Sequence, residues 1–238
     1  MYQNVFKRYE LKYIITKEQK RYLLDLCAPY IKADKYGHST VRNIYYDTDN
    51  YRLIRRSLEK PMYKEKIRLR SYSKADENGI VFAELKKKYD SVVYKRRLAV
   101  SIENGEKWLC GEGESPVINQ ISKEIDYFIG YYQGLKPKVF LSYEREAYYL
   151  NNDMNFRITF DENILFRKDR LSLCEDVFGQ ALISSDFVLM ELKTAGGIPL
   201  WLTHILSEQK IYKTAFSKYG NAYQKLYLTE KNKNGLNI

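Results

Sequence analysis

The stretch Lys66-Ile67-Arg68-Leu69-Arg70 alternates strictly between charged and apolar side chains. Successive side chains of a β-strand point to opposite faces, so the three cations form one row and Ile67 and Leu69 form an apolar row behind it. This spacing constrains the fold to a sheet with one face packed on a core. A row of cations suits an anion, although a strand with one solvated face shows the same alternation.

An acid and a lysine recur at the same two-residue spacing elsewhere in the chain. These pairs are Glu10 and Lys12, Glu84 and Lys86, and Glu191 and Lys193. Side chains two residues apart on a strand share a face, so each pair presents a carboxylate and an ammonium group together. Several such strands predict a wall that holds phosphates and the metal ions that accompany them.

Composition narrows the class of protein. The chain has 238 residues, of which 45% are hydrophobic and 29% charged, as in a globular protein with a real core. Its length and the absence of a linker-like segment predict one domain over residues 1–228, followed by a polar, frayed tail over 229–238. The formal net charge of +10 indicates an anionic partner, which can be a nucleic acid, an anionic lipid or a phosphorylated small molecule.

Cysteine and histidine usage excludes some site types. Cys27, Cys110 and Cys174 are odd in number and widely spaced, which favours a reducing cytoplasm over a disulfide framework or a zinc site. His38 and His204 are the only histidines, so a His-rich metal centre is excluded and a Ser-His-Asp triad is disfavoured. The sequence shows no signal peptide and no apolar run of about 18 residues, so any membrane contact is expected to be peripheral.

Periodicity and turn residues predict the elements. Strands are expected over residues 5–15, 40–46, 63–73, 80–88, 91–101, 138–150, 154–161, 164–168 and 186–194. Helices are expected after Thr16, after Asp47, over residues 115–134, after Pro199 and after Ser217. About eight antiparallel strands with a few helices predict an α+β domain, a closed or nearly closed eight-stranded β-barrel with flanking helices, because closure removes exposed strand edges. An interior lined by Lys and Arg makes physical sense only around an anion.

The motifs match a known family in order and spacing. They are Tyr9-Glu10-Leu11-Lys12-Tyr13, Asn43-Ile44-Tyr45-Tyr46-Asp47, Arg68-Leu69-Arg70, Phe82-Ala83-Glu84-Leu85-Lys86, Tyr94-Lys95-Arg96, Ser142-Tyr143-Glu144-Arg145, Arg157-Ile158-Thr159-Phe160-Asp161, Leu189-Met190-Glu191-Leu192-Lys193 and Phe216-Ser217-Lys218-Tyr219. From about Phe6 to Tyr219 the chain resembles the VTC domain, the polyphosphate polymerase module of the vacuolar transporter chaperone family, within the CYTH-like triphosphate tunnel metalloenzymes.

The resemblance implies a site. Residues matching the family's tunnel-lining cations are Lys12, Arg68, Arg70, Lys86, Lys95, Arg145, Arg157 and Lys218. They are expected to hold nucleotide phosphates or polyphosphate, and we add Lys193, which shares a strand face with Glu191. Glu191 matches the residue that binds a divalent metal, manganese or magnesium, while Glu10 and Glu84 are either further metal ligands or salt-bridge partners of the lysines.

The implied reaction transfers the ATP γ-phosphate to the end of a polyphosphate chain and releases ADP. We expect the catalytic set to be Arg68, Arg70, Lys86, Arg157 and Glu191, since phosphoryl transfer mainly requires alignment and neutralisation of oxygen charge. A triphosphate hydrolase on the same fold and a non-catalytic binder of polyphosphate or nucleic acid remain alternatives. Arg8 stands where tunnel triphosphatases carry a first glutamate, which favours the polymerase, and no specific nucleic-acid module is recognised. The sequence does not specify an oligomeric state.

Overall fold

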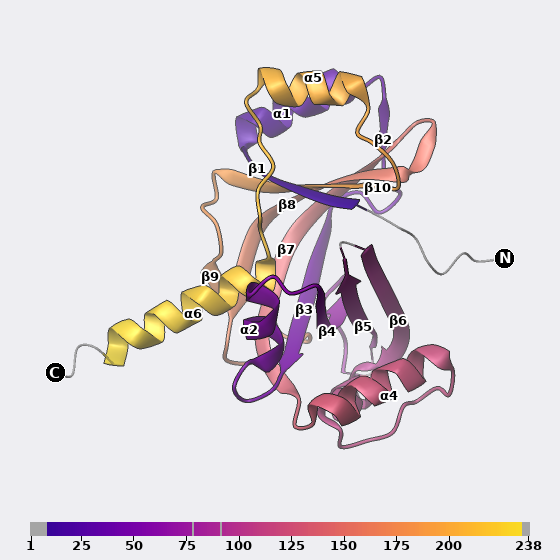
Figure 1. Cartoon of the computed structure of the whole chain (residues 1–238), viewed down its shortest axis with the longest axis vertical. Helices are drawn as coiled ribbons and strands as arrows, with labels where there is room; N and C mark the ends of the chain where they lie inside the picture. Colours follow the sequence, from indigo (N-terminus) through magenta and orange to yellow (C-terminus); the bar gives the residue numbers. More distant parts are fainter. Residues whose placement is uncertain (1–8, 78, 91, 235–238) are drawn as a thin grey trace.

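Figure 1 shows the computed structural model of the chain, which describes residues 9–77, 79–90 and 92–234, with the side chains of 228–234 left aside. The strands are β1 (Tyr9–Thr16), β2 (Ile31–Ala33), β3 (Ser39–Asp47), β4 (Tyr63–Ser71), β5 (Ile80–Tyr89), β6 (Val92–Ser101), β7 (Lys136–Leu150), β8 (Asp153–Arg167), β9 (Gln180–Ala181) and β10 (Phe187–Thr194). The helices are α1 (Lys17–Cys27), α2 (Arg52–Leu58), α3 (Ile102–Cys110), α4 (Gln120–Tyr132), α5 (Leu200–Glu208) and α6 (Lys218–Asn234).

One antiparallel sheet organises the molecule. Its eight long strands pair in the order β1-β10-β8-β7-β3-β4-β5-β6, with short β2 added to β7 and short β9 added to β8. The α+β class is confirmed, but full closure of the sheet is wrong, because no backbone ladder joins β1 to β6 among the described residues. Side chains link the two ends of the sheet instead, since Lys86 on β5 lies 2.7 Å from Glu10 on β1.

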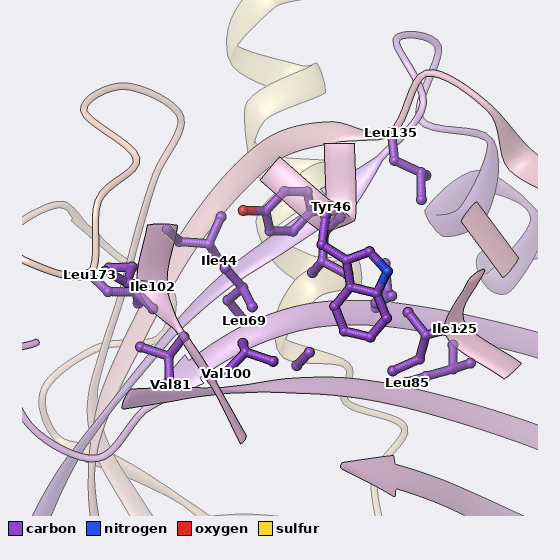
Figure 2. Close-up of a cluster of buried hydrophobic side chains, with 14 of the residues drawn as sticks. Ile44, Tyr46, Leu69, Val81, Leu85, Val100, Ile102, Ile125, Leu135 and Leu173 are labelled. Atoms are coloured by element: carbon purple, nitrogen blue, oxygen red, sulfur yellow. The ribbon is translucent and has the colours of Figure 1, made fainter. Parts of the chain in front are cut away.

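Helices cover two separate parts of the outer face. Below, in Figure 1, α4 covers the outer face of β4, β5 and β6, where the apolar rows of these strands meet α3 and α4. Figure 2 shows this cluster, with Leu69, Val81 and Val100 from the strands and Ile125 from α4. At the top of the view α1 and α5 cover β1, β10 and β8 through a second cluster that includes Leu23, Met190, Phe160 and Leu202.

The opposite face of the same strands, called here the inner face, is apolar at only one end. There Val41, Leu141 and Leu189 pack with Phe216 and Tyr219 at the start of α6. The segment before α6 crosses from the α5 side to this end, so the N-terminus of α6 covers the inner face at that point (Figure 1). The rest of the inner face carries charged residues of β1, β4, β5, β6, β7, β8 and β10.

Several observed elements differ from the expected ones, the short strands β2 and β9 among them. Residues 154–161 and 164–168 belong to one strand, β8, which runs to Arg167. The helix expected from residue 115 begins at Gln120, because Asn119 and Ser122 form the capping box while Ser115 makes a local turn with Val117. Helix α3 was not expected, and its N-cap is Ser101, the last residue of β6.

Both ends of the chain include residues that the structure does not describe. Arg8 and the first residues of the expected strand 5–15 lie outside the described residues. Helix α6 continues to Asn234, past residue 228 where a tail was expected, and residues 235–238 are not described. None of the described helices combines the length and apolar composition needed to cross a membrane.

Candidate functional site

Strand register places the predicted cations on the inner face. Arg68 pairs with Glu84, and Glu84 pairs in turn with Arg97, so these three side chains stand in a row across β4, β5 and β6. In the next row Lys66, Lys86 and Lys95 are partners across the same strands. Apolar residues of the intervening positions, such as Leu69 and Ala83, face the outer core, so the alternation seen in the sequence is what divides the two faces.

Glu84 is the centre of one charge cluster. It is almost fully buried, and its carboxylate accepts hydrogen bonds from Arg68 (2.7 Å) and Arg97 (2.6 Å) and pairs with Lys95 at 2.8 Å. Burial raises the pKa of Glu84, but the surrounding cations outweigh it and hold the pKa well below its ordinary value. Of the two roles considered for Glu84, these contacts match the salt-bridge partner.

Glu191 and Asp161 form a second cluster on β10 and β8. Arg145 donates to Asp161 at 2.6 Å, and Lys218 from α6 donates to Asp161 at 2.5 Å and to Glu191 at 3.2 Å. Lys12 lies 3.4 Å from Glu191, and Lys193 and Arg145 lie 3.5 and 3.7 Å from it. Burial raises the pKa of Glu191, but Lys218 and Lys12 hold that pKa well below its ordinary value. Both carboxylates are therefore ionised and outnumbered by cations.

Glu10 joins the two halves of the inner face. Its carboxylate lies 2.7 Å from Lys86 and 3.7 Å from Lys12, and the Lys12 ammonium donates to the Phe216 carbonyl at 2.9 Å. Lys12, β1 and the segment before α6 are therefore held against the β4–β5 side of the sheet. Side chains thus bridge the two ends of the sheet, which no backbone ladder joins among the described strands.

Tyr143, which the sequence analysis did not assign to the site, lies between the clusters. Its hydroxyl accepts a hydrogen bond from Arg70 at 2.9 Å, and the Arg145 guanidinium and the Lys218 ammonium lie 4.9 and 4.5 Å from its ring centre. Burial raises the pKa of Tyr143, but Arg145 and Arg70 lower it more, so the net direction is downward. A cation-supported hydroxyl at this position can donate to a phosphate oxygen.

Arg157 stands apart from the central clusters. It lies across from Lys193 in the β8–β10 ladder, but its guanidinium pairs with Asp34 at 2.9 Å and lies over the ring of Tyr149 at 5.1 Å. The Arg157 Nε atom and the nearby Thr159 hydroxyl are buried and have no hydrogen-bond partner among the residues that the structure describes. Buried donors without partners are costly unless a ligand or water satisfies them.

The structure therefore brings together most of the predicted residues and adds others. Lys12, Arg68, Arg70, Lys86, Lys95, Arg145, Lys193 and Lys218 lie on the inner face with Glu10, Glu84 and Glu191, while Arg157 lies at its margin. Sequence reasoning missed Asp161, Tyr143 and Arg97. The signal for Arg97 was present, since it is two residues from Lys95 and must share its face, whereas Arg96 faces outward and pairs with Glu124 at 3.0 Å.

The carboxylates of the inner face are the candidate ligands for a divalent metal ion. No three His, Cys, Asp or Glu side chains gather into a group able to hold a metal ion within the described ranges. Glu10 and Glu191 are close enough for their charges to interact. Mg²⁺ is commonly held by one or two carboxylates together with phosphate oxygens and water. The donor set fits an ion that arrives with a phosphate ligand and is met by Glu191 and Glu10, and it does not fit an ion held by the protein alone.

Comparison with known proteins decides the family. The family model of the VTC domain matches residues 7–227, which is nearly the whole chain. The chain belongs to the VTC domain family. The resemblance drawn from the motifs is thereby confirmed.

Individual relatives of this VTC domain are distant. Vacuolar transporter chaperone complex subunit 4 of Schizosaccharomyces pombe is 31% identical over 157 residues, which cover 55% of this chain and 21% of that protein. The VTC domain described here thus spans about a fifth of that relative.

A solved structure shows the fold. A Bacillus halodurans protein named as a candidate adenylate cyclase aligns over 90% of this chain and 96% of its own, with a TM-score of 0.54 and 15% identity. A candidate adenylyl cyclase from Hippeastrum with a dominant triphosphatase activity aligns over 89% of this chain and 93% of its own, with a TM-score of 0.48 and 17% identity.

Proposed function

We propose that this VTC domain is an ATP- and divalent-metal-dependent polyphosphate polymerase. The observation that carries the proposal is the inner face, where cations from both halves of the sheet and from α6 outnumber four buried or half-buried carboxylates: Glu10, Glu84, Asp161 and Glu191. Such a surface is electrostatically unfavourable until an extended polyanion lies along it. The S. pombe relative, named as a subunit of the vacuolar transporter chaperone complex, supports the choice of polyanion.

Each residue has a role in this proposal. Arg68 and Arg70 offer guanidinium groups that can bind phosphate oxygens in two-point contacts, and Lys86 supplies a point charge beside them. Arg157 at the margin holds a more distant phosphate through its Nε atom, which has no hydrogen-bond partner in the described part of the chain. The phosphates of the donor and the acceptor chain are also held by Lys12, Lys95, Arg145, Lys193 and Lys218.

The reaction breaks the bond between the γ-phosphorus and the β–γ bridging oxygen and forms a bond from a terminal polyphosphate oxygen to that phosphorus, with ADP as the leaving group. The protein contributes alignment and charge neutralisation, and no side-chain nucleophile is needed. A bound manganese or magnesium ion, held by Glu191 and assisted by Glu10, supplies Lewis-acid neutralisation of the phosphoryl oxygens. Glu84 orients Arg68, Arg97 and Lys95 toward the same anion.

The setting of this activity is part of the proposal. We place it in the cytoplasm, where the three unpaired cysteines stay reduced, as one domain over residues 1–228. A separate membrane-protein partner, of the kind implied by the name of the S. pombe relative, brings the domain to a membrane. Co-purification of the tagged domain with a membrane fraction, and its loss from that fraction in high salt, tests this placement.

One assay tests the activity. The purified protein is incubated with ATP and manganese, and the products are separated on a gel that resolves phosphate chains. Chains longer than triphosphate together with ADP are the expected products. Free phosphate without longer chains would support the triphosphate hydrolase instead, and binding of polyphosphate without turnover under any metal would support a binding module.

A further inference from the structure

Lys66 differs in its partners from Lys86 and Lys95, the two lysines that stand in the same row of the inner face. Its ammonium group donates to the Ser217 hydroxyl at 2.9 Å. Within the described part of the chain it forms no ion pair with a carboxylate, whereas Lys86 pairs with Glu10 and Lys95 pairs with Glu84. Lys66 is therefore held on the inner face by a neutral oxygen alone.

The charged groups around Lys66 are of its own sign. They are Lys12 on β1, Lys64 and Arg68 on β4, and Lys86 on β5, and the neutral partner is the hydroxyl of Ser217, the residue directly before α6. The nearby carboxylates are engaged by these same cations: Glu10 by Lys86, Glu84 by Arg68 and Glu191 by Lys12. Burial first, and then repulsion from Lys12 and Lys86, lower the pKa of Lys66 to about 7.

An anion on the inner face reverses this local field. We propose that Lys66 is an additional phosphate-binding residue of this VTC domain and that it gains a proton when an inorganic polyphosphate or a nucleotide triphosphate binds. The inference rests on the proposed function, because it assumes that the inner face receives a phosphate chain. Ser217 suits the change, since its hydroxyl accepts a hydrogen bond from an ammonium group and donates one to a neutral amine.

Proton uptake at Lys66 makes the affinity for the polyanion depend on pH. Near pH 8 most free protein carries a neutral Lys66, so binding takes up a proton at this residue, whereas near pH 6 the proton is already there. Affinity for the polyanion therefore falls as the pH rises above about 7, by up to tenfold for each pH unit, in addition to any titration of the ligand. Arginine at position 66 stays charged throughout this range and removes this part of the pH dependence.

The experiment is calorimetric titration of the full chain with sodium tripolyphosphate at pH 8 in two buffers of different ionisation enthalpy. Wild type, Lys66→Arg and Lys66→Met are compared, and Lys87→Arg is the matched control, because Lys87 lies on the outer face beside Glu124. The ligand's own protons contribute equally to all four. We expect wild type and Lys87→Arg to take up between half and one proton more than Lys66→Arg, and Lys66→Met to bind at least tenfold more weakly than Lys66→Arg.

Equal proton uptake by wild type and Lys66→Arg would overturn the proposal while leaving phosphate binding, and thus the proposed function, in place. Failure of wild type to bind tripolyphosphate at any pH would overturn both. A second measurement does not depend on the variants folding. In protein with ¹³C-labelled lysine, the Lys66 Cε signal should titrate near pH 7 without ligand and remain that of a charged lysine up to at least pH 9 with tripolyphosphate. An unchanged midpoint would contradict the proposal.

Discussion

At the scale of single residues, the site consists of carboxylates that are each surrounded by several cations. Asp161 is fully buried between Arg145 and Lys218, and Glu84 is almost fully buried between Arg68 and Arg97. Burying charges in this way stabilises a fold little, and removing one partner leaves the others uncompensated. These clusters therefore make sense as devices that fix the directions of arginine and lysine side chains toward a ligand.

The metal assignment yields a kinetic prediction. Glu191→Gln keeps the size of the side chain and removes its charge, so manganese-dependent turnover should fall by a factor on the order of 10² or more. Arg70→Ala should lower the rate and also weaken ATP affinity, because a guanidinium contacts phosphate in the ground state and the transition state alike. Steady-state rates and ATP affinities of both variants are the measurements. Glu124→Gln is the control, since Glu124 pairs with Arg96 on the outer face, and full activity in Glu191→Gln would refute the assignment.

The lowered pKa of Lys66 yields a stability prediction. Below about pH 7 Lys66 of the folded protein is charged among other cations, and the full destabilisation of the folded state by this buried charge is present. As the pH rises above 7, Lys66 of the folded protein loses its proton and this destabilisation declines. Lys66→Met should therefore raise the melting temperature of ligand-free protein more at pH 6 than at pH 9. Thermal unfolding of both proteins at the two pH values is the test. A gain that is the same at both would mean that Lys66 is not repelled in the folded state.

At the scale of elements, local capping chemistry decides where helices begin. The Asn119 side chain accepts from the Ser122 N–H at 2.9 Å, and the Ser122 hydroxyl accepts from the Asn119 N–H at 3.0 Å. Both Ser115-Pro116 and Asn119 are acceptable starts for α4 in sequence terms. The observed start leaves Val117 and Ile118 exposed and begins the helix where Ile125 and Phe128 reach the outer core.

Two cap variants distinguish the expected start of α4 from the observed one. Asn119→Ala should lower the free energy of unfolding by about 1 kcal/mol, because a helix N–H loses its acceptor. Ser115→Ala should change it by less than about 0.5 kcal/mol, because Ser115 caps only a surface turn. Urea denaturation of the two variants beside wild type measures both. A larger loss in Ser115→Ala than in Asn119→Ala would contradict the assignment of the cap.

Helix α3 tests how closely the outer face is packed. A Cβ atom at Gly105 would lie 2.8 Å from Val100 Cγ2 and 3.1 Å from Leu69 Cδ2, inside the core that holds β4 and β6. Overpacking at this position should outweigh the better helix propensity of alanine, so Gly105→Ala is expected to destabilise the protein by about 1–3 kcal/mol. Gly130→Ala is the control, because a Cβ there meets nothing within 4 Å. Should Gly105→Ala unfold at the same urea concentration as Gly130→Ala, α3 would have to pack more loosely than observed.

At the scale of the whole molecule, two apolar clusters on the outer face hold together a sheet whose inner face repels itself. The ends of the sheet are linked by Lys86 and Glu10, and α6 inserts Lys218 between Asp161 and Glu191. A polyanion that binds only the folded form neutralises several cations at once. The ligand should therefore act on the stability of the entire domain.

Tripolyphosphate should raise the melting temperature. A ligand at 100 times its dissociation constant stabilises the folded state by about 2.7 kcal/mol, which corresponds to a shift of roughly 5–10 °C for a domain of this size. Sodium chloride at equal ionic strength is the control, since it screens charges without occupying the inner face. Thermal unfolding in the two salts is the comparison, and indistinguishable shifts would exclude a polyanion site on the inner face.

The sequence by itself determined which side chains share a face. Alternation along a strand follows from backbone stereochemistry, so Arg68 with Arg70 and Glu191 with Lys193 could be grouped with no knowledge of the neighbouring strands. The order and spacing of the motifs likewise identified the family. The spacing of Lys95, Arg96 and Arg97 showed that only alternate members share a face, but not which of them face inward.

The tertiary structure alone decided which faces meet. Lys66 and its partner Ser217 are 151 residues apart in the sequence, and Lys86 and its partner Glu10 are 76 residues apart. No local sequence pattern therefore encodes either pair. The same holds for Asp34 beside Arg157 and for the absence of a ladder between β1 and β6 in the described chain. Strand order, register and closure depend on how the helices pack on the outer face, because that packing sets the curvature of the sheet and hence which charged rows approach each other.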